Sequence, residues 1–129
     1  MSTNKGVALL LALWTLAIVA MLLVVALQLS TTDLQIVANH ELRARALYIA
    51  DAGIEYAVSR LKNSKANFSQ NMTFPAGSGH SYSVTYTSSS STISSTGTLS
   101  SGEAVSLEVK VSVTGSAPYQ VKILSWREV

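Results

Sequence analysis

The sequence predicts an α+β protein in which one long N-terminal α-helix packs on a small antiparallel β-sheet. Three observations support this fold class: an unbroken apolar run, a continuation with apolar residues at helical spacing, and a C-terminal half in which apolar and polar residues alternate. The chain has 129 residues, enough for an anchor and one small domain. The predicted segments are a polar leader (1–6), an apolar helix (7–29), its amphipathic continuation (30–62) and a small β domain (63–129).

The apolar run has the length and composition of a membrane-spanning helix. Thr15 is the only polar side chain in residues 7–27, and no residue there is charged. At about 1.5 Å per residue this stretch would rise about 31 Å, which matches a hydrocarbon core of about 30 Å. A cleaved secretory signal has a shorter apolar core of about 7–15 residues, and Ala26-Leu27-Gln28 fits its cleavage site poorly. We therefore expect a single membrane span, with Trp14 as a packing residue inside it.

The helix is expected to continue beyond the span, because no residue ends a helix decisively before Asn63 and Ser64. Apolar residues recur there at spacings of three and four, which gives the helix one apolar face: Leu47, Ala50, Ile54, Val58 and Leu61. Gly53 costs about 1 kcal/mol relative to alanine in a helix, so close packing is the expected reason for it. The alternative is two helices joined near residues 30–32.

A β domain is predicted from alternation of apolar and polar side chains. Residues 63–79 are polar and contain Pro75 and two glycines, so a loop is predicted there. Two strands then place the following residues on one face: Tyr82, Val84 and Tyr86 in the first, and Val105, Leu107, Val109, Val111 and Val113 in the second. A last strand begins with Tyr119, Val121 and Ile123. Between them, the Ser/Thr-rich residues 87–101 form either a disordered linker or, as we prefer, a weak strand at 92–99.

One-sided alternation implies a sheet with a single buried face. The apolar helix face from Leu47 to Leu61 is the only large apolar surface available to cover it. We therefore expect one sheet laid on one helix.

Composition excludes several function classes. Nine Lys/Arg and seven Asp/Glu give a net charge of +2 without any basic block, so no nucleic-acid partner is predicted. The absence of cysteine excludes disulfides, thiol catalysis and cysteine-bound metal. His40 and His80 stand alone, and no serine lies in a G-x-S-x-G motif. No metal, no cofactor and no enzymatic activity are predicted.

The stretch ALYIADAGIEYAVSRL, residues 46–61, resembles the A-x-x-A-[DE]-A-G-[IL]-E segment of PilX-like minor pilins. It is similar, more loosely, to the tip minor pseudopilin of type II secretion. Together with the short basic leader, the apolar helix and the small sheet, it makes the chain resemble a type IV pilin-like protein. The resemblance implies a pilin-like fold and cleavage by prepilin peptidase between Gly6 and Val7, directly after Lys5. It also implies lateral packing of the apolar helix on other pilins.

The resemblance further implies a function and a location. The expected function is a minor pilin or pseudopilin that primes, caps or decorates a type IV pilus or a type II secretion pseudopilus. The expected location is the bacterial inner membrane, single-pass with a cytoplasmic N-terminus before processing, and afterwards the periplasm or a surface filament. Leu11 stands where major pilins carry a glutamate, five residues after the cut, and this loss favours a tip or initiating subunit. The alternative is a single-span protein whose exported β module acts as an adhesin or accessory subunit.

Overall fold

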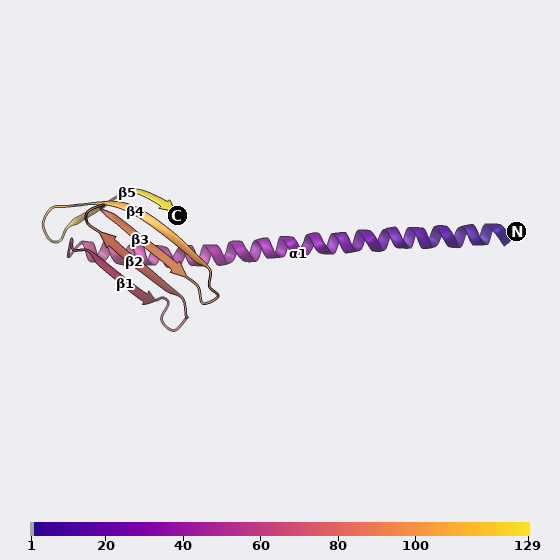
Figure 1. Ribbon diagram of the computed structural model, residues 1–129, viewed down its shortest axis with the longest axis horizontal. Helices are drawn as coiled ribbons and strands as arrows, with labels where there is room; N and C mark the ends of the chain where they lie inside the picture. Colours follow the sequence, from indigo (N-terminus) through magenta and orange to yellow (C-terminus); the bar gives the residue numbers. More distant parts are fainter. Residues whose placement is uncertain (1) are drawn as a thin grey trace. The chain divides into compact units, whose positions relative to one another are not determined.

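The computed structural model describes residues 2–129, with side chains from Asn4 onwards; Met1, the first residue of the predicted leader, lies outside the described residues. The described part contains one helix and five strands (Figure 1): α1 (Ser2–Leu61), β1 (Phe68–Thr73), β2 (Ser81–Thr87), β3 (Thr92–Thr98), β4 (Ala104–Thr114) and β5 (Gln120–Glu128). The predicted α+β fold, a long helix packed on an antiparallel sheet, is confirmed.

Helix α1 is continuous over 60 residues, so the alternative of two helices joined near residues 30–32 is wrong. The hydroxyls of Thr31 and Thr32 both donate to the Gln28 carbonyl, at 2.8 and 3.0 Å, and thereby stay within the helix instead of interrupting it. The helix also begins at Ser2 and not near Val7 as expected. The single glycine at Gly6 costs only about 1 kcal/mol in a helix, which is too little to prevent the helix from extending beyond Val7 towards the N-terminus.

The chain divides into two compact units, residues 1–39 and 40–129. The first unit consists of the N-terminal part of α1. The second, which we call the head, contains the C-terminal part of α1 and all five strands. Because α1 contributes to both, the head is built on the same helix that carries the apolar run.

The sheet has the strand order β1-β2-β3-β4-β5, and every pair of neighbours is antiparallel. Within the head the strands lie over α1 in chain order (Figure 1). The predicted alternation in β2 and β4 is confirmed, because one face of each strand is buried against the helix. The core consists of apolar side chains from that face and from α1: Ala46, Ile49, Ala50, Ile54, Ala57, Leu61, Phe68, Tyr82, Val84, Tyr86, Ile93, Leu99, Val105, Leu107, Val109 and Val111.

Strand β1 corrects the prediction of a loop over residues 63–79. Its six residues pair with β2, from Phe68 opposite Tyr86 to Thr73 opposite Ser81. Only Phe68 is buried, so the strand has no apolar alternation for the sequence to display. An edge strand can be held mainly by main-chain hydrogen bonds to its neighbour, and these bonds do not require a particular pattern of apolar and polar side chains.

The Ser/Thr-rich segment forms a strand, β3, at the centre of the sheet, so the linker alternative is wrong. The predicted last strand is also present as β5, but most of its residues are exposed. Ile123 is 52% exposed and Trp126 is 53% exposed. The register of β5 shifts between Lys110 and Val111 of its neighbour β4, and β5 is the edge of the sheet. Both features leave its apolar side chains only partly covered.

Candidate functional site

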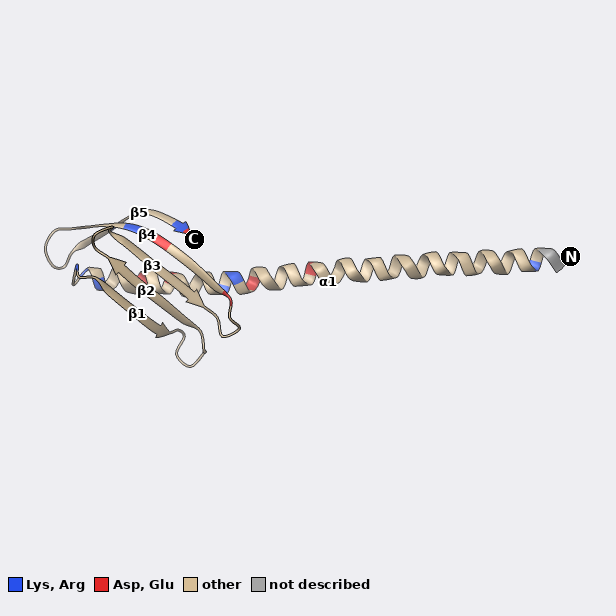
Figure 2. Cartoon of the chain, in the orientation of Figure 1, with Lys and Arg blue, Asp and Glu red and all other residues tan. Residues whose placement is uncertain are grey.

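The first unit exposes an uncharged apolar surface along α1. No Lys, Arg, Asp or Glu occurs between Lys5 and Asp33, and this stretch is the long tan part of the helix in Figure 2. Leu11 is 60% exposed and Trp14 is 66% exposed, like the other large side chains around them. Such a helix is long and apolar enough to cross a membrane. This is evidence for a single-pass membrane anchor.

Thr15, the one polar side chain of residues 7–27, is satisfied within its own helix. Its hydroxyl donates to the Ala12 carbonyl at 2.9 Å. A membrane helix leaves its backbone groups satisfied internally, and here the polar side chain is satisfied as well. The apolar stretch therefore offers packing rather than charge pairing to a neighbouring helix.

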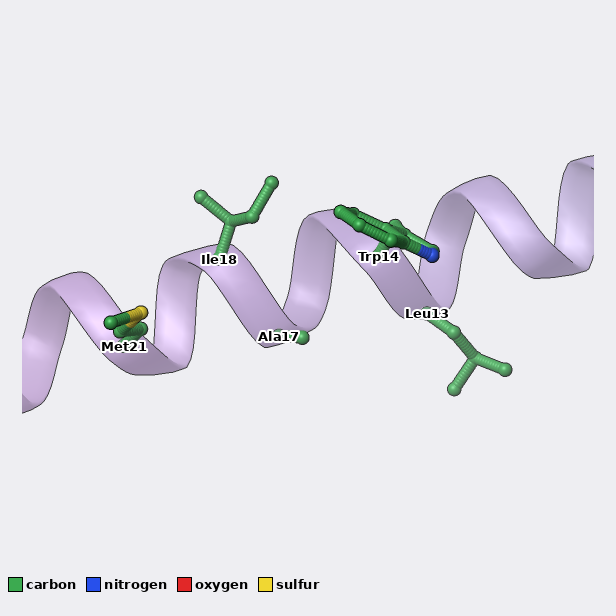
Figure 3. Close-up of a pocket in the computed structure, with 5 residues that line it drawn as sticks. All are labelled: Leu13, Trp14, Ala17, Ile18 and Met21. Carbon is green, nitrogen blue, oxygen red and sulfur yellow. The ribbon is translucent and has the colours of Figure 1, made fainter.

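A groove of about 300 Å³ lies on this stretch, lined by Leu13, Trp14, Ala17, Ile18 and Met21. Figure 3 shows the Ala17 methyl ending close to the ribbon, with Leu13 and Met21 one turn away on either side and the larger Trp14 and Ile18 next to it. The groove exists because one small residue stands among four large ones.

The predicted cleavage residues Lys5, Gly6 and Val7 lie in the first turns of α1 and are exposed. A methyl group added at Gly6 would meet nothing within 4 Å. The folded chain therefore has no packing reason of its own for glycine at this position.

The residues predicted to pack the helix on the sheet lie in the head. Ala50, Gly53, Ile54 and Leu61 are buried, whereas Leu47 and Val58 are half-buried at the side of the contact. The centre of the contact also includes three residues that the prediction omitted: Ala46, Ile49 and Ala57. The helix face that meets the sheet is therefore built mainly of small residues.

The sheet matches this small-residue face with small residues of its own, which the sequence reading missed. A methyl group at Gly97 of β3 would overlap the Ala46 carbonyl oxygen and the Ala50 nitrogen, both backbone atoms. A methyl group at Gly53 would overlap Ser95 Oγ. Ser95 is fully buried, and its hydroxyl donates to the Ala50 carbonyl at 2.7 Å. The alternation of Ser95 and Gly97 on one face of a Ser/Thr-rich stretch was the available signal.

Aromatic side chains close one side of the head. Tyr82 lies 6.2 Å from Tyr56 of α1 and 6.4 Å from Phe74, centroid to centroid. Its hydroxyl donates to the Met72 sulfur at 3.3 Å. Burial, and secondarily the neighbouring Tyr56, raise the pKa of the Tyr82 phenol. The fold therefore favours the neutral form of Tyr82.

Charged side chains are confined mostly to the head (Figure 2), and among the described residues three ion pairs lie at its surface. Arg43 of α1 lies 2.7 Å from Glu128 of β5 and joins the helix to the last strand. Glu41 and Arg45, four residues apart on α1, form a second ion pair with a separation of 2.6 Å. These pairs are exposed, and exposed pairs contribute about 0–1 kcal/mol each. They therefore change the stability of the head only slightly, and they do not form a binding site.

Side chains for metal or acid–base chemistry are scattered. Over the described residues there is no group of three or more His, Asp or Glu that could hold a metal ion. His80 accepts a hydrogen bond at Nδ1 from the Ser100 amide, at 3.0 Å, and so belongs to the packing of two turns.

No protein-family model, curated protein or solved structure matches the chain. The described part of the chain consists of a head, in which one sheet lies on one helix, and an uncharged apolar stretch of that same helix.

Proposed function

We propose that the chain is a minor pilin or pseudopilin, a structural subunit that primes, caps or decorates a type IV pilus or a type II secretion pseudopilus. It enters the bacterial inner membrane with its N-terminus in the cytoplasm. Prepilin peptidase then removes residues 1–6 by cutting between Gly6 and Val7. The apolar part of α1 packs on the helices of other pilins, and the head is displayed in the periplasm or on a filament.

One observation carries the proposal: a single helix supplies both the exposed apolar stretch and the surface on which the sheet folds. An ordinary membrane anchor needs no structural continuity with the domain that follows it. A subunit that is pulled out of the membrane into a filament does need it, because the helix must transmit the movement to the head. The small-residue contact through Gly53 and Gly97 brings the sheet close to the backbone of that helix.

Leu11 supports a place at the start or tip of an assembly. Burying a carboxylate in a membrane costs about 2.5–3.5 kcal/mol when it has no partner. A subunit that pairs with no amine above it gains nothing from an acid at this position. An apolar side chain there is what such a subunit requires.

The test is the mass of the chain in cells with and without prepilin peptidase. We expect a chain that begins at Val7 in the first cells and a chain that retains Lys5 and Gly6 in the second. The variant Gly6→Val should keep its leader in both, because a side chain at Gly6 hinders entry into the peptidase. Ala12→Val, which adds similar bulk inside the span, is the matched control and should be processed normally.

A chain that retains its leader in cells that process other pilins would refute the proposal. That result would favour a permanently anchored protein whose β module acts as an adhesin or accessory subunit.

A further inference from the structure

The two edges of the sheet differ in how they are protected from further pairing. Strand β5, at one edge, carries Lys122, Arg127 and Glu128, and its register with β4 is interrupted by a shift. Charges and bulges of this kind keep an edge from adding another strand. Strand β1, at the other edge, has the sequence FSQNMT, without charge or proline, and pairs with β2 in an uninterrupted register. The edge at β1 is therefore the one that is open to a further strand (Figure 1).

The free main-chain groups of β1 can be assigned from its pairing with β2. In an antiparallel pair, residues that exchange main-chain hydrogen bonds with the neighbour alternate with residues that do not. The Phe74 amide donates to the His80 carbonyl at 2.9 Å, which continues the β1–β2 register, so the even-numbered residues of β1 bond to β2. The 3.2 Å hydrogen bond between Ser69 Oγ and Thr85 Oγ1 agrees, because side chains lie closest in the pairs without main-chain bonds. The residues that direct their N–H and C=O groups away from β2 are therefore Ser69, Asn71 and Thr73.

Side chains beside this edge favour a particular kind of added strand. On the face that meets α1, Phe68 is buried, whereas Met72 is 41% exposed and offers apolar surface. Arg60 of α1 lies over the Phe68 ring, 4.7 Å from its centroid, and donates to the Tyr56 hydroxyl at 3.3 Å. These contacts hold the guanidinium next to β1, and Arg60 forms no ion pair with any residue that the structure describes. A carboxylate on the added strand opposite Phe68 lies within reach of this charge, because directly opposed Cβ atoms are about 4.5–5.5 Å apart.

We propose that β1 binds an extended segment of a partner protein, which adds to the sheet antiparallel to β1. Antiparallel addition continues the pattern of the sheet, and its hydrogen bonds are slightly more favourable than those of a parallel pair. In this direction the residue opposite Met72 precedes the residue opposite Phe68 by four positions, and both face α1. The segment therefore has an apolar residue followed, four positions later, by Asp or Glu.

A second copy of this chain fits this edge less well. Its own edge strands are β1, which contains no acid, and β5, whose Glu128 already lies 2.7 Å from Arg43. Either strand, added antiparallel to β1, would reverse the second head along the strand direction, and with it residues 40–61 of α1. Two chains whose N-terminal helices enter one membrane from the same side do not present their heads in opposite directions. The occupant is therefore a segment of a different protein.

The experiment uses the full chain, labelled with heavy nitrogen and held in detergent micelles, and a synthetic peptide as the probe. The peptide TLTVTET places leucine opposite Met72 and glutamate opposite Phe68 in the antiparallel register. We expect nuclear magnetic resonance to show shifts of the outward-facing amides of β1, and slower hydrogen exchange there, while the amides of β5 stay unchanged. In the matched peptide TLTVTKT, lysine replaces glutamate and should bind about threefold or more weakly, because it is repelled by Arg60.

Variants of the chain test the edge and the charge separately. Asn71→Pro removes one outward N–H and should weaken binding of TLTVTET about tenfold or more, whereas Asn71→Ala keeps that N–H and should bind as the parent chain does. Arg60→Gln should remove the preference for glutamate over lysine. Lys122→Gln, at the opposite edge, removes the same charge and should leave the preference unchanged. Unaltered spectra of β3 and β4 show that the head of each variant is folded.

Absence of binding at millimolar peptide, shifts at β5 instead of β1, or equal affinity for the two peptides would overturn the inference. Self-association of the parent chain that Asn71→Pro abolishes would also overturn it, because the occupant would then be a second copy. If Asn71→Pro does not fold, the response of the outward-facing amides and the difference between the two peptides still decide the outcome. None of these measurements depends on removal of the leader, so failure of this inference leaves the proposed function untouched.

Discussion

Replacing Gly97 by alanine tests the contact that fixes the sheet to the helix. The added methyl would overlap the Ala46 carbonyl oxygen and the Ala50 nitrogen, and neither can rotate away because both belong to the backbone of α1. Overpacking of this kind costs about 1–3 kcal/mol. Alanine regains about 0.5–1 kcal/mol because it is less flexible than glycine in the unfolded chain. Because both overlapping atoms are backbone, the cost lies in the upper part of that range, and the net expectation is destabilisation of the head by about 1–2 kcal/mol.

Such a loss should lower the unfolding temperature of the head by about 5–15 °C, since 1 kcal/mol corresponds to about 4–8 °C in a domain of this size. The measurement is thermal unfolding of the full chain in detergent, followed by near-ultraviolet circular dichroism. Ser94→Ala, on the exposed face of the same strand, is the control and should change stability by less than about 0.5 kcal/mol. Equal stability of Gly97→Ala and Ser94→Ala would refute the close approach of β3 to α1.

Two further predictions concern the same interface. Gly53→Ala should destabilise the head by about 1 kcal/mol or more, although alanine has the better helix propensity, because the added methyl meets Ser95 Oγ. Adding Ser95→Ala to the same chain should restore part of the lost stability. Purely additive effects of the two substitutions would contradict the contact. Burial raises the pKa of Tyr82, so its neutral form contributes stability that is complete below the unfolded pKa of about 10 and is lost as pH rises through the raised folded value. Denaturant titrations between about pH 8 and 11 should therefore show a smaller alkaline loss of stability for Tyr82→Phe than for the parent chain, and identical slopes would count against this assignment.

The fold could be predicted where the burial of one face determines which residues are apolar. The alternation in β2 and β4 and the spacing from Ala50 to Leu61 arise because one face of each element is buried. Strand β1 escaped prediction because an edge strand is held by main-chain hydrogen bonds, which any sequence can make.

The candidate sites were predictable to different degrees. The apolar run could be recognised directly in the sequence, because a membrane span needs about 20 consecutive apolar residues. The contacts of Gly53 with Ser95 and of Gly97 with Ala46 could not be predicted in this way. Each pair joins residues more than 40 positions apart, and its meaning depends on which strand crosses the helix at which point.

The consecutive order of the strands has a consequence for biosynthesis. A chain is made from its N-terminus, so the face of α1 that ends at Leu61 exists before any strand has emerged. Each new strand then finds its partner in the hairpin neighbour made just before it, and none must wait for a later segment. Short-range pairing of this kind forms quickly and leaves few exposed edges for aggregation. The head can therefore be assembled strand by strand on a platform that is already in place.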